Sequence, residues 1–209
     1  MASITPVQFI PRRVKMAFSS IEIANQFVDL SLRDGVDDLT PMKIQKLVFY
    51  AHGWHWAIFD SPLIDEQVEA WEYGPVIPRL YSNLREYGNQ PITEHLRTVN
   101  FGSDFDWSKF EWIEPGIGCQ ENATADEKSN AIALTEAVWK KFKGYSAIQL
   151  SNMTHMLGTP WAETVSETKQ LNAGILPKGT DIPADRIRKY FKSIMVKGSA
   201  SEHREEAHT

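Results

Sequence analysis

The sequence is poor in cysteine, because Cys119 is the only one among its 209 residues. One cysteine permits no internal disulfide, and without a CxxC partner it does not suggest a zinc site or a redox centre. The first sixteen residues also lack a secretory signal, since their charged residues follow the weak apolar run instead of preceding it. These absences lead us to expect a cytoplasmic protein.

An excess of positive charge is also missing. The chain has 22 basic and 27 acidic residues, interspersed, which gives a net charge of -5. Such a chain has no broad basic surface to neutralise phosphates, so nucleic acid is not expected as the main ligand. The longest apolar segment, residues 41–59, is just under the ~20 residues that span a bilayer and contains Lys43 and Lys46, so we expect no membrane span.

Motifs of known enzyme chemistry are absent as well. The sequence contains no glycine-rich phosphate loop, no GxSxG element and no kinase or dinucleotide signature. We therefore expect a protein that is not an enzyme and needs no metal or organic cofactor.

What the sequence does contain is an apolar segment, PMKIQKLVFYAHGWHWAIF at 41–59, which predicts a central buried helix. Thr40 can cap it and Pro41 suits its first position. Gly53 predicts a close approach by another backbone. Six residues of the segment recur at helical spacing and should face the core: Ile44, Leu47, Val48, Ala51, His55 and Ile58.

Further helices are predicted at 19–35, 78–88, 124–144, 146–158, 159–165 and 183–194. Three of them begin with capping-box pairs, namely Ser19 with Glu22, Thr124 with Glu127, and Ser146 with Gln149. Within 124–144, Glu136 and Lys140 have the spacing of an i,i+4 ion pair.

Residues 67–73 favour a strand, and 89–122 an irregular or short-stranded region over the core. The predicted fold class is mainly α: a single compact helical domain at 19–196 around a central buried helix, with a small β element. A flexible arm at 1–18 and a disordered tail at 197–209 should flank it.

Two histidines on the predicted central helix raise the question of a metal site. His52 and His55 are three residues apart, and His155 could approach them, but the HExxH arrangement of zinc hydrolases is missing. Packed or hydrogen-bonded histidines are therefore the favoured interpretation.

A cluster of acidic residues, Asp65, Glu66, Glu69 and Glu72, could suggest acid–base chemistry. Carboxylates at every third position are more typical of the solvated side of a strand or loop. A small metal-dependent or carboxylate-based hydrolase remains the alternative.

Three motifs occur in order: KLVFYAHG, EAWEYGPVIPRLY, and LSNMTH followed by a Pro-Trp pair. In this order they resemble the Panacea domain of SocA-like antitoxins and GepA-like phage-associated proteins, over about residues 21–194. His52 stands where the family often has glutamine, which argues against a metal. The family positions found here are Lys46, Leu47, Tyr50, Ala51, Gly53, Glu69, Ala70, Trp71, Gly74, Pro75, Val76, Pro78, Tyr81, Leu150, Ser151, His155, Pro160 and Trp161.

The resemblance implies an antitoxin that neutralises a cognate protein toxin, encoded nearby, by direct binding. In one branch of the family it also implies delivery of the toxin to an ATP-dependent protease of the ClpXP type. A general phage-associated interaction module is the other alternative, and the sequence does not fix an oligomeric state.

We expect the partner to bind beside the turn-helix at 74–81 and the junction at 155–161, where Gly-Pro and Thr-Pro breaks let side chains project. Arg79 and Glu163 should face solvent, while Trp71 and Trp161 serve either as partner anchors or to fix turns. The candidate residues are Trp71, Tyr73, Gly74, Pro75, Val76, Arg79, Tyr81, His155, Pro160, Trp161 and Glu163.

Overall fold

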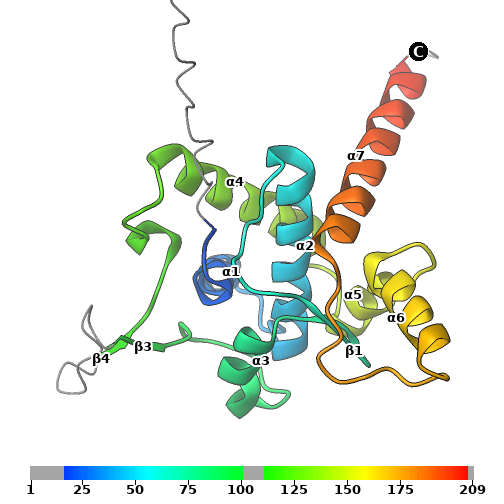
Figure 1. Cartoon of the computed structure of the whole chain (residues 1–209). Helices are drawn as coiled ribbons and strands as arrows, with labels where there is room; N and C mark the ends of the chain where they lie inside the picture. Colours follow the sequence, from blue (N-terminus) through cyan, green and yellow to red (C-terminus); the bar gives the residue numbers. More distant parts are fainter. Residues whose placement is uncertain (1–16, 101–110, 207–209) are drawn as a thin grey trace, which may run out of the picture.

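A computed structural model describes residues 17–100 and 111–206 of the chain (Figure 1). Residues 1–16 of the predicted arm and 207–209 of the predicted tail lie outside the described residues. Across the described ranges the protein has seven α-helices and two small two-stranded sheets, so the predicted mainly α fold with a small β element is confirmed.

Helix α2 (Pro41–Phe59) lies at the centre, and α1, α4, α5 and α7 pack against it (Figure 1). The hydroxyl of Thr40 accepts the Lys43 amide at its N-terminus, as predicted. Leu47 and Val48 are fully buried, which confirms the central helix. The prediction for Ile58 was wrong: it is 53% exposed, whereas the adjacent Ala57 is 5% exposed, so the last turn of the helix is covered on another side.

The other helices begin close to the predicted positions, but α5 ends at Thr154 instead of residue 158, and α6 continues to Leu171 instead of ending at 165. All three capping boxes form, and Gly35 ends α1 in the left-handed conformation. The helices are α1 (Ser20–Asp34), α3 (Pro78–Leu84), α4 (Ala125–Phe142), α5 (Ala147–Thr154), α6 (Pro160–Leu171) and α7 (Ala184–Glu206), with short 3-10 helices at Arg85–Tyr87 and Ile117–Cys119.

Helix α7 differs from the prediction at both its contact with α2 and its end. A Cβ on Gly53 would lie 2.2 Å from the ring of Phe191, so the close approach to Gly53 is made by a side chain of α7 and not by a backbone. The helix continues to Glu206 although disorder was predicted from Lys197. Extending an existing helix needs no new nucleus, and residues 197–206 contain no proline to stop it.

The predicted strand is only β1 (Glu69–Trp71), which pairs antiparallel with β2 (Gly74–Val76). The second strand was missed because its Gly-Pro sequence indicates a turn. On the other edge of β1, the Ala70 amide donates to the carbonyl of Thr180, so the chain before α7 covers that edge. Strands β3 (Thr98–Asn100) and β4 (Glu111–Ile113) form the second sheet, in the region predicted to be short-stranded.

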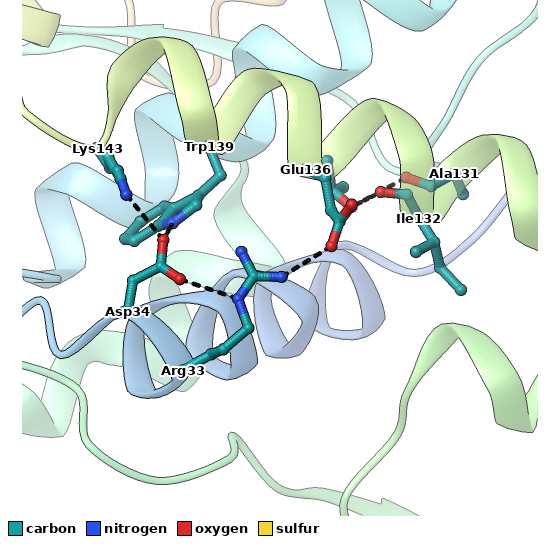
Figure 2. A network of polar contacts seen from close by, with 8 residues as sticks. Arg33, Asp34, Ala131, Ile132, Glu136, Trp139 and Lys143 are labelled. Carbon is teal, nitrogen blue, oxygen red and sulfur yellow. Dashed lines mark hydrogen bonds and ion pairs between the residues drawn. The ribbon is translucent and has the colours of Figure 1, made fainter.

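A polar network joins α1 to α4 (Figure 2). Asp34 accepts from the indole of Trp139 at 2.8 Å and from Lys143 at 2.9 Å, and the pKa of its carboxyl is held well below the usual range by hydrogen bonds, foremost from Arg33. Glu136 pairs with Arg33 at 2.8 Å. In place of the predicted pairing with Lys140, Glu136 of α4 thus makes an ion pair with Arg33 of α1.

Candidate partner-binding site

A side chain of α6 holds the turn between β1 and β2 by a hydrogen bond. The indole Nε1 of Trp161, in the first turn of α6, donates to the carbonyl of Trp71 at 2.8 Å. Trp71 in turn donates its own Nε1 to the carboxylate of Glu69 at 2.7 Å. Both tryptophans are half-buried, and their hydrogen bonds explain why indoles stand beside the two proline-containing breaks: they fix the turn.

Helix α5 holds the next two carbonyls of the same turn. Ser151 donates its hydroxyl to the carbonyl of Tyr73 at 2.9 Å, and the Nε2 of His155 lies 3.1 Å from the carbonyl of Glu72. The Nδ1 of His155 lies 2.7 Å from the carbonyl of Ser151, one helical turn earlier. Three consecutive carbonyls of the turn are therefore bound by side chains from α5 and α6.

The buried side of the turn is closed by α2. The ammonium of Lys46 donates to the carbonyl of Pro75 at 3.1 Å, and the residue is 1% exposed. Gly74 has φ +102°, and a Cβ there would lie 2.6 Å from the hydroxyl of Thr154 and 2.8 Å from the Lys46 nitrogen. Only glycine fits this backbone and this space. Desolvation lowers the pKa of Lys46 to about 7.

A groove of about 440 Å³ lies between this turn, the start of α2 and α3. The rings of Trp71 and Tyr81 meet with centroids 4.7 Å apart along it. Tyr73 is 63% exposed and Tyr81 42%, so both can contact a partner. The residues that line the groove are Pro41, Met42, Gln45, Lys46, Trp71, Glu72, Tyr73, Val76, Tyr81, Leu84, Arg85, Gly88 and Asn89.

Two exposed apolar side chains stand next to the turn on the α5–α6 connection. Met156 and Leu157 directly follow His155, which is bonded to the turn, and Leu157 is 99% exposed. The sequence analysis missed both, as it missed Met42 and Arg85 in the groove. Their one signal was position, because Met156 and Leu157 precede the helix stop at Gly158 and the new start at Pro160.

Nine of the eleven predicted site residues fall into three groups, two of which share Val76. Trp71, Tyr73, Val76 and Tyr81 line the groove, whereas Trp161 and His155 hold the turn from outside it. The buried members of the set, which have little surface to offer a partner, are Gly74, Pro75, Val76 and Pro160.

Arg79 and Glu163 are exposed, as predicted, but they pair with different parts of the molecule. Arg79 lies 3.5 Å from Glu66, which caps the start of α1 by accepting from the backbone and the hydroxyl of Ser20. Glu163 lies 3.8 Å from Arg186 and therefore faces α7. Glu163 is thus directed away from the groove.

The two core histidines are buried and hydrogen-bonded, in keeping with the favoured interpretation. The ring of His52 contacts the indole of Trp56 at 3.1 Å and the backbone amide of Ile64 at 3.3 Å, and burial lowers its pKa to about 3. His55 faces the carbonyl of Ser61 at 2.7 Å.

Searches of the described ranges for a metal site and for a membrane span found neither. No group of three or more His, Cys, Asp or Glu side chains there is placed to hold a metal ion. No helix there is long and apolar enough to cross a membrane. Glu66, which was predicted on a solvated side, is half-buried, and burial raises the pKa of its carboxyl.

Comparison with known proteins gives one match. A family model described as antitoxin SocA-like, Panacea domain, matches residues 44–162. This range contains the β1–β2 turn and all four side chains that bond to it, from Lys46 in α2 to Trp161 in α6. Neither the search among curated proteins nor the search among solved structures returned a significant match. The chain belongs to the antitoxin SocA-like, Panacea-domain family.

Proposed function

We propose that this protein is an antitoxin of a toxin-antitoxin system and neutralises its cognate protein toxin by binding it directly. The toxin docks on the groove between the β1–β2 turn and α3, together with the neighbouring α5–α6 connection. The observation that carries this placement is the pair of exposed tyrosines: Tyr73 on a turn fixed by side chains of three other helices, and Tyr81 on the adjacent α3.

Two physical features support this surface as an interface. Aromatic side chains are enriched among the few residues that carry most of the binding free energy in protein complexes. The hydrogen bonds to the turn hold Tyr73 in place before binding, which lowers the entropy lost on association. Leu157, almost fully exposed next to this turn, adds apolar surface at its edge.

The enzyme alternative has less support from the geometry. Glu69 accepts the Trp71 indole and Glu66 accepts from Ser20, so two of the four clustered carboxylates act as structural acceptors. The groove itself is lined mostly by apolar and aromatic side chains with one carboxylate, that of Glu72. Such a lining suits a binding surface better than hydrolysis by a pair of carboxylates.

Delivery of the bound toxin to an ATP-dependent protease is a compatible second role. It requires a surface separate from the toxin site, for the protease. Figure 1 shows the C-terminal part of α7 projecting from the rest of the domain, on the side away from α3. This helix is the segment we propose for such a contact.

The test is capture of the toxin encoded beside this gene. Tyr73→Ala and Tyr81→Ala should each weaken binding about tenfold or more and reduce growth rescue in cells expressing the toxin. Melting temperatures should stay within about 3 °C of the parent, because the side chains are exposed.

The controls are Trp112→Ala, which removes an aromatic side chain 60% exposed on β4, and Glu163→Ala beside α7. Both should capture the toxin like the parent. Loss of capture in Trp112→Ala with full capture in both tyrosine variants would move the interface to residues 89–122.

A further inference from the structure

Two basic side chains in the groove have no acidic partner among the described residues. Within the described residues Lys46 donates to the carbonyl of Pro75 alone, which leaves two N–H groups of its ammonium without an acceptor there. Arg85, in the 3-10 helix after α3, is exposed and makes no ion pair with the part of the chain that the structure describes. Glu72 is the one acidic residue of the groove, so the lining carries a net positive charge.

Arg85 is exceptional in this protein. Every other arginine whose side chain is described pairs with a carboxylate: Arg33, Arg79, Arg97, Arg186 and Arg188. The chain as a whole has five more acidic than basic residues, so carboxylates are not scarce. The lack of an ion pair at Arg85 is therefore unusual among the described residues, because the chain has more acidic than basic residues and the other described arginines are paired.

Lys46 adds a second basic group to the same groove wall, a buried amine that is protonated below its pKa of about 7. Charged amines are rarely fully buried unless they are paired, because desolvation disfavours the charged form. Here the compensation within the described residues is a single backbone carbonyl. A carboxylate that entered the groove would supply the missing opposite charge.

We propose that the groove receives an acidic side chain of the toxin, an aspartate or glutamate beside an apolar residue. The apolar residue packs on the rings of Trp71 and Tyr81, and the carboxylate is neutralised by Arg85 and Lys46. This inference rests on the proposed function, because it names the chemistry of the partner at the same surface.

The test uses two small probes of equal shape, 3-phenylpropionate and its neutral amide. Their binding to the full chain is followed by NMR through the indole N–H signal of Trp71. The carboxylate should bind up to about fivefold more tightly than the amide, which is the upper end of the range for one exposed ion pair. Arg85→Gln should abolish this preference, and Lys46→Met should reduce it.

Lys140→Gln is the matched control, because Lys140 is exposed on α4, outside the groove. It removes the same charge and should leave the preference intact. Equal binding of acid and amide to the parent, or an undiminished preference in Arg85→Gln, overturns the inference. Should Lys46→Met fail to fold, the exposed Arg85 alone decides the outcome.

Failure of this inference is distinguishable from failure of the proposed function. If Tyr73→Ala and Tyr81→Ala lose the toxin while the probes show no preference for the acid, the groove is the interface but does not select a carboxylate. If the acid is preferred but the tyrosine variants still rescue growth, the acid site stands and the toxin binds elsewhere.

Discussion

Lys46 has a structural role at the turn, and we propose a binding role for the same side chain. Its hydrogen bond to Pro75 fixes β2 against α2, yet its burial at 1% exposure disfavours the charged amine. The hydrogen-bond partner of its nitrogen among the described residues is the Pro75 carbonyl, which is not ionisable. The pKa of Lys46 therefore falls from 10.5 to about 7 through desolvation alone.

This pKa predicts a pH dependence of stability. Below pH 7 the amine is protonated in both states, and the penalty for burying the charge is fully present. Between pH 7 and 10.5 the unfolded chain holds the proton and the folded chain does not, so the contribution of Lys46 to the free energy of unfolding rises with pH.

The measurement is urea unfolding of the parent and of Lys46→Met between about pH 6 and 9.5, since the difference cancels all groups that the two proteins share. From pH 7 to the upper limit the difference should shift in favour of the parent by about 3 kcal/mol. A difference that stays constant over this interval would show that Lys46 keeps an ordinary pKa in the folded protein.

At the scale of elements, the β1–β2 hairpin depends on its surroundings. Its strands have three residues each, and an isolated two-stranded hairpin is marginal in water. What holds it is the set of donors from α2, α5 and α6, together with the chain before α7 on the outer edge of β1. The shape of the groove therefore depends on packing among segments far apart in the sequence.

Gly74→Ala tests this dependence. The substitution places a Cβ against Thr154 and Lys46 in a residue with positive φ, so we expect a loss of about 2 to 4 kcal/mol in the free energy of unfolding. Gly35→Ala is the control, because Gly35 has the left-handed helical conformation with positive φ but nothing lies within 4 Å of the added Cβ. The control should cost about 1 kcal/mol. Equal losses in chemical denaturation would mean that Gly74 is needed for its backbone conformation alone.

The sequence predicted elements whose signals are local. The capping boxes at Ser19, Thr124 and Ser146 and the periodicity of α2 rest on residues within a few positions of each other, and all are present. It did not predict β2, which depends on pairing with segments elsewhere in the fold. It also did not predict the end of α7, which depends on extension of an existing helix. The exposure of Ile58 likewise depends on which side of the helix the neighbouring elements cover.

The candidate site was predicted in part for the same reason. Tyr73 and Tyr81, two of the candidate residues, line the groove, but Glu163 pairs with Arg186 of α7, and no local pattern specifies that contact. Arg85 was not predicted as a site residue. Its lack of an ion pair among the described residues becomes apparent only when the structure shows that the other described arginines are paired.

At the scale of the whole molecule, the two faces of the hairpin have different roles. One face is tied to α2, α5 and α6 by residues that lie inside the matched family segment, 44–162. The other presents Tyr73 to solvent beside the groove. Side chains from three helices of the matched segment thus hold the hairpin, and the exposed side chains around it are those we propose to contact the toxin.

The most direct test of the central claim is amide hydrogen exchange of the full chain with and without its toxin. We predict that the toxin slows exchange at the turn residues 72–73, along 81–89 and at 156–158, while 111–119 stay unchanged. Slower exchange confined to 111–119, with the groove and the α5–α6 connection unaffected, would contradict the account.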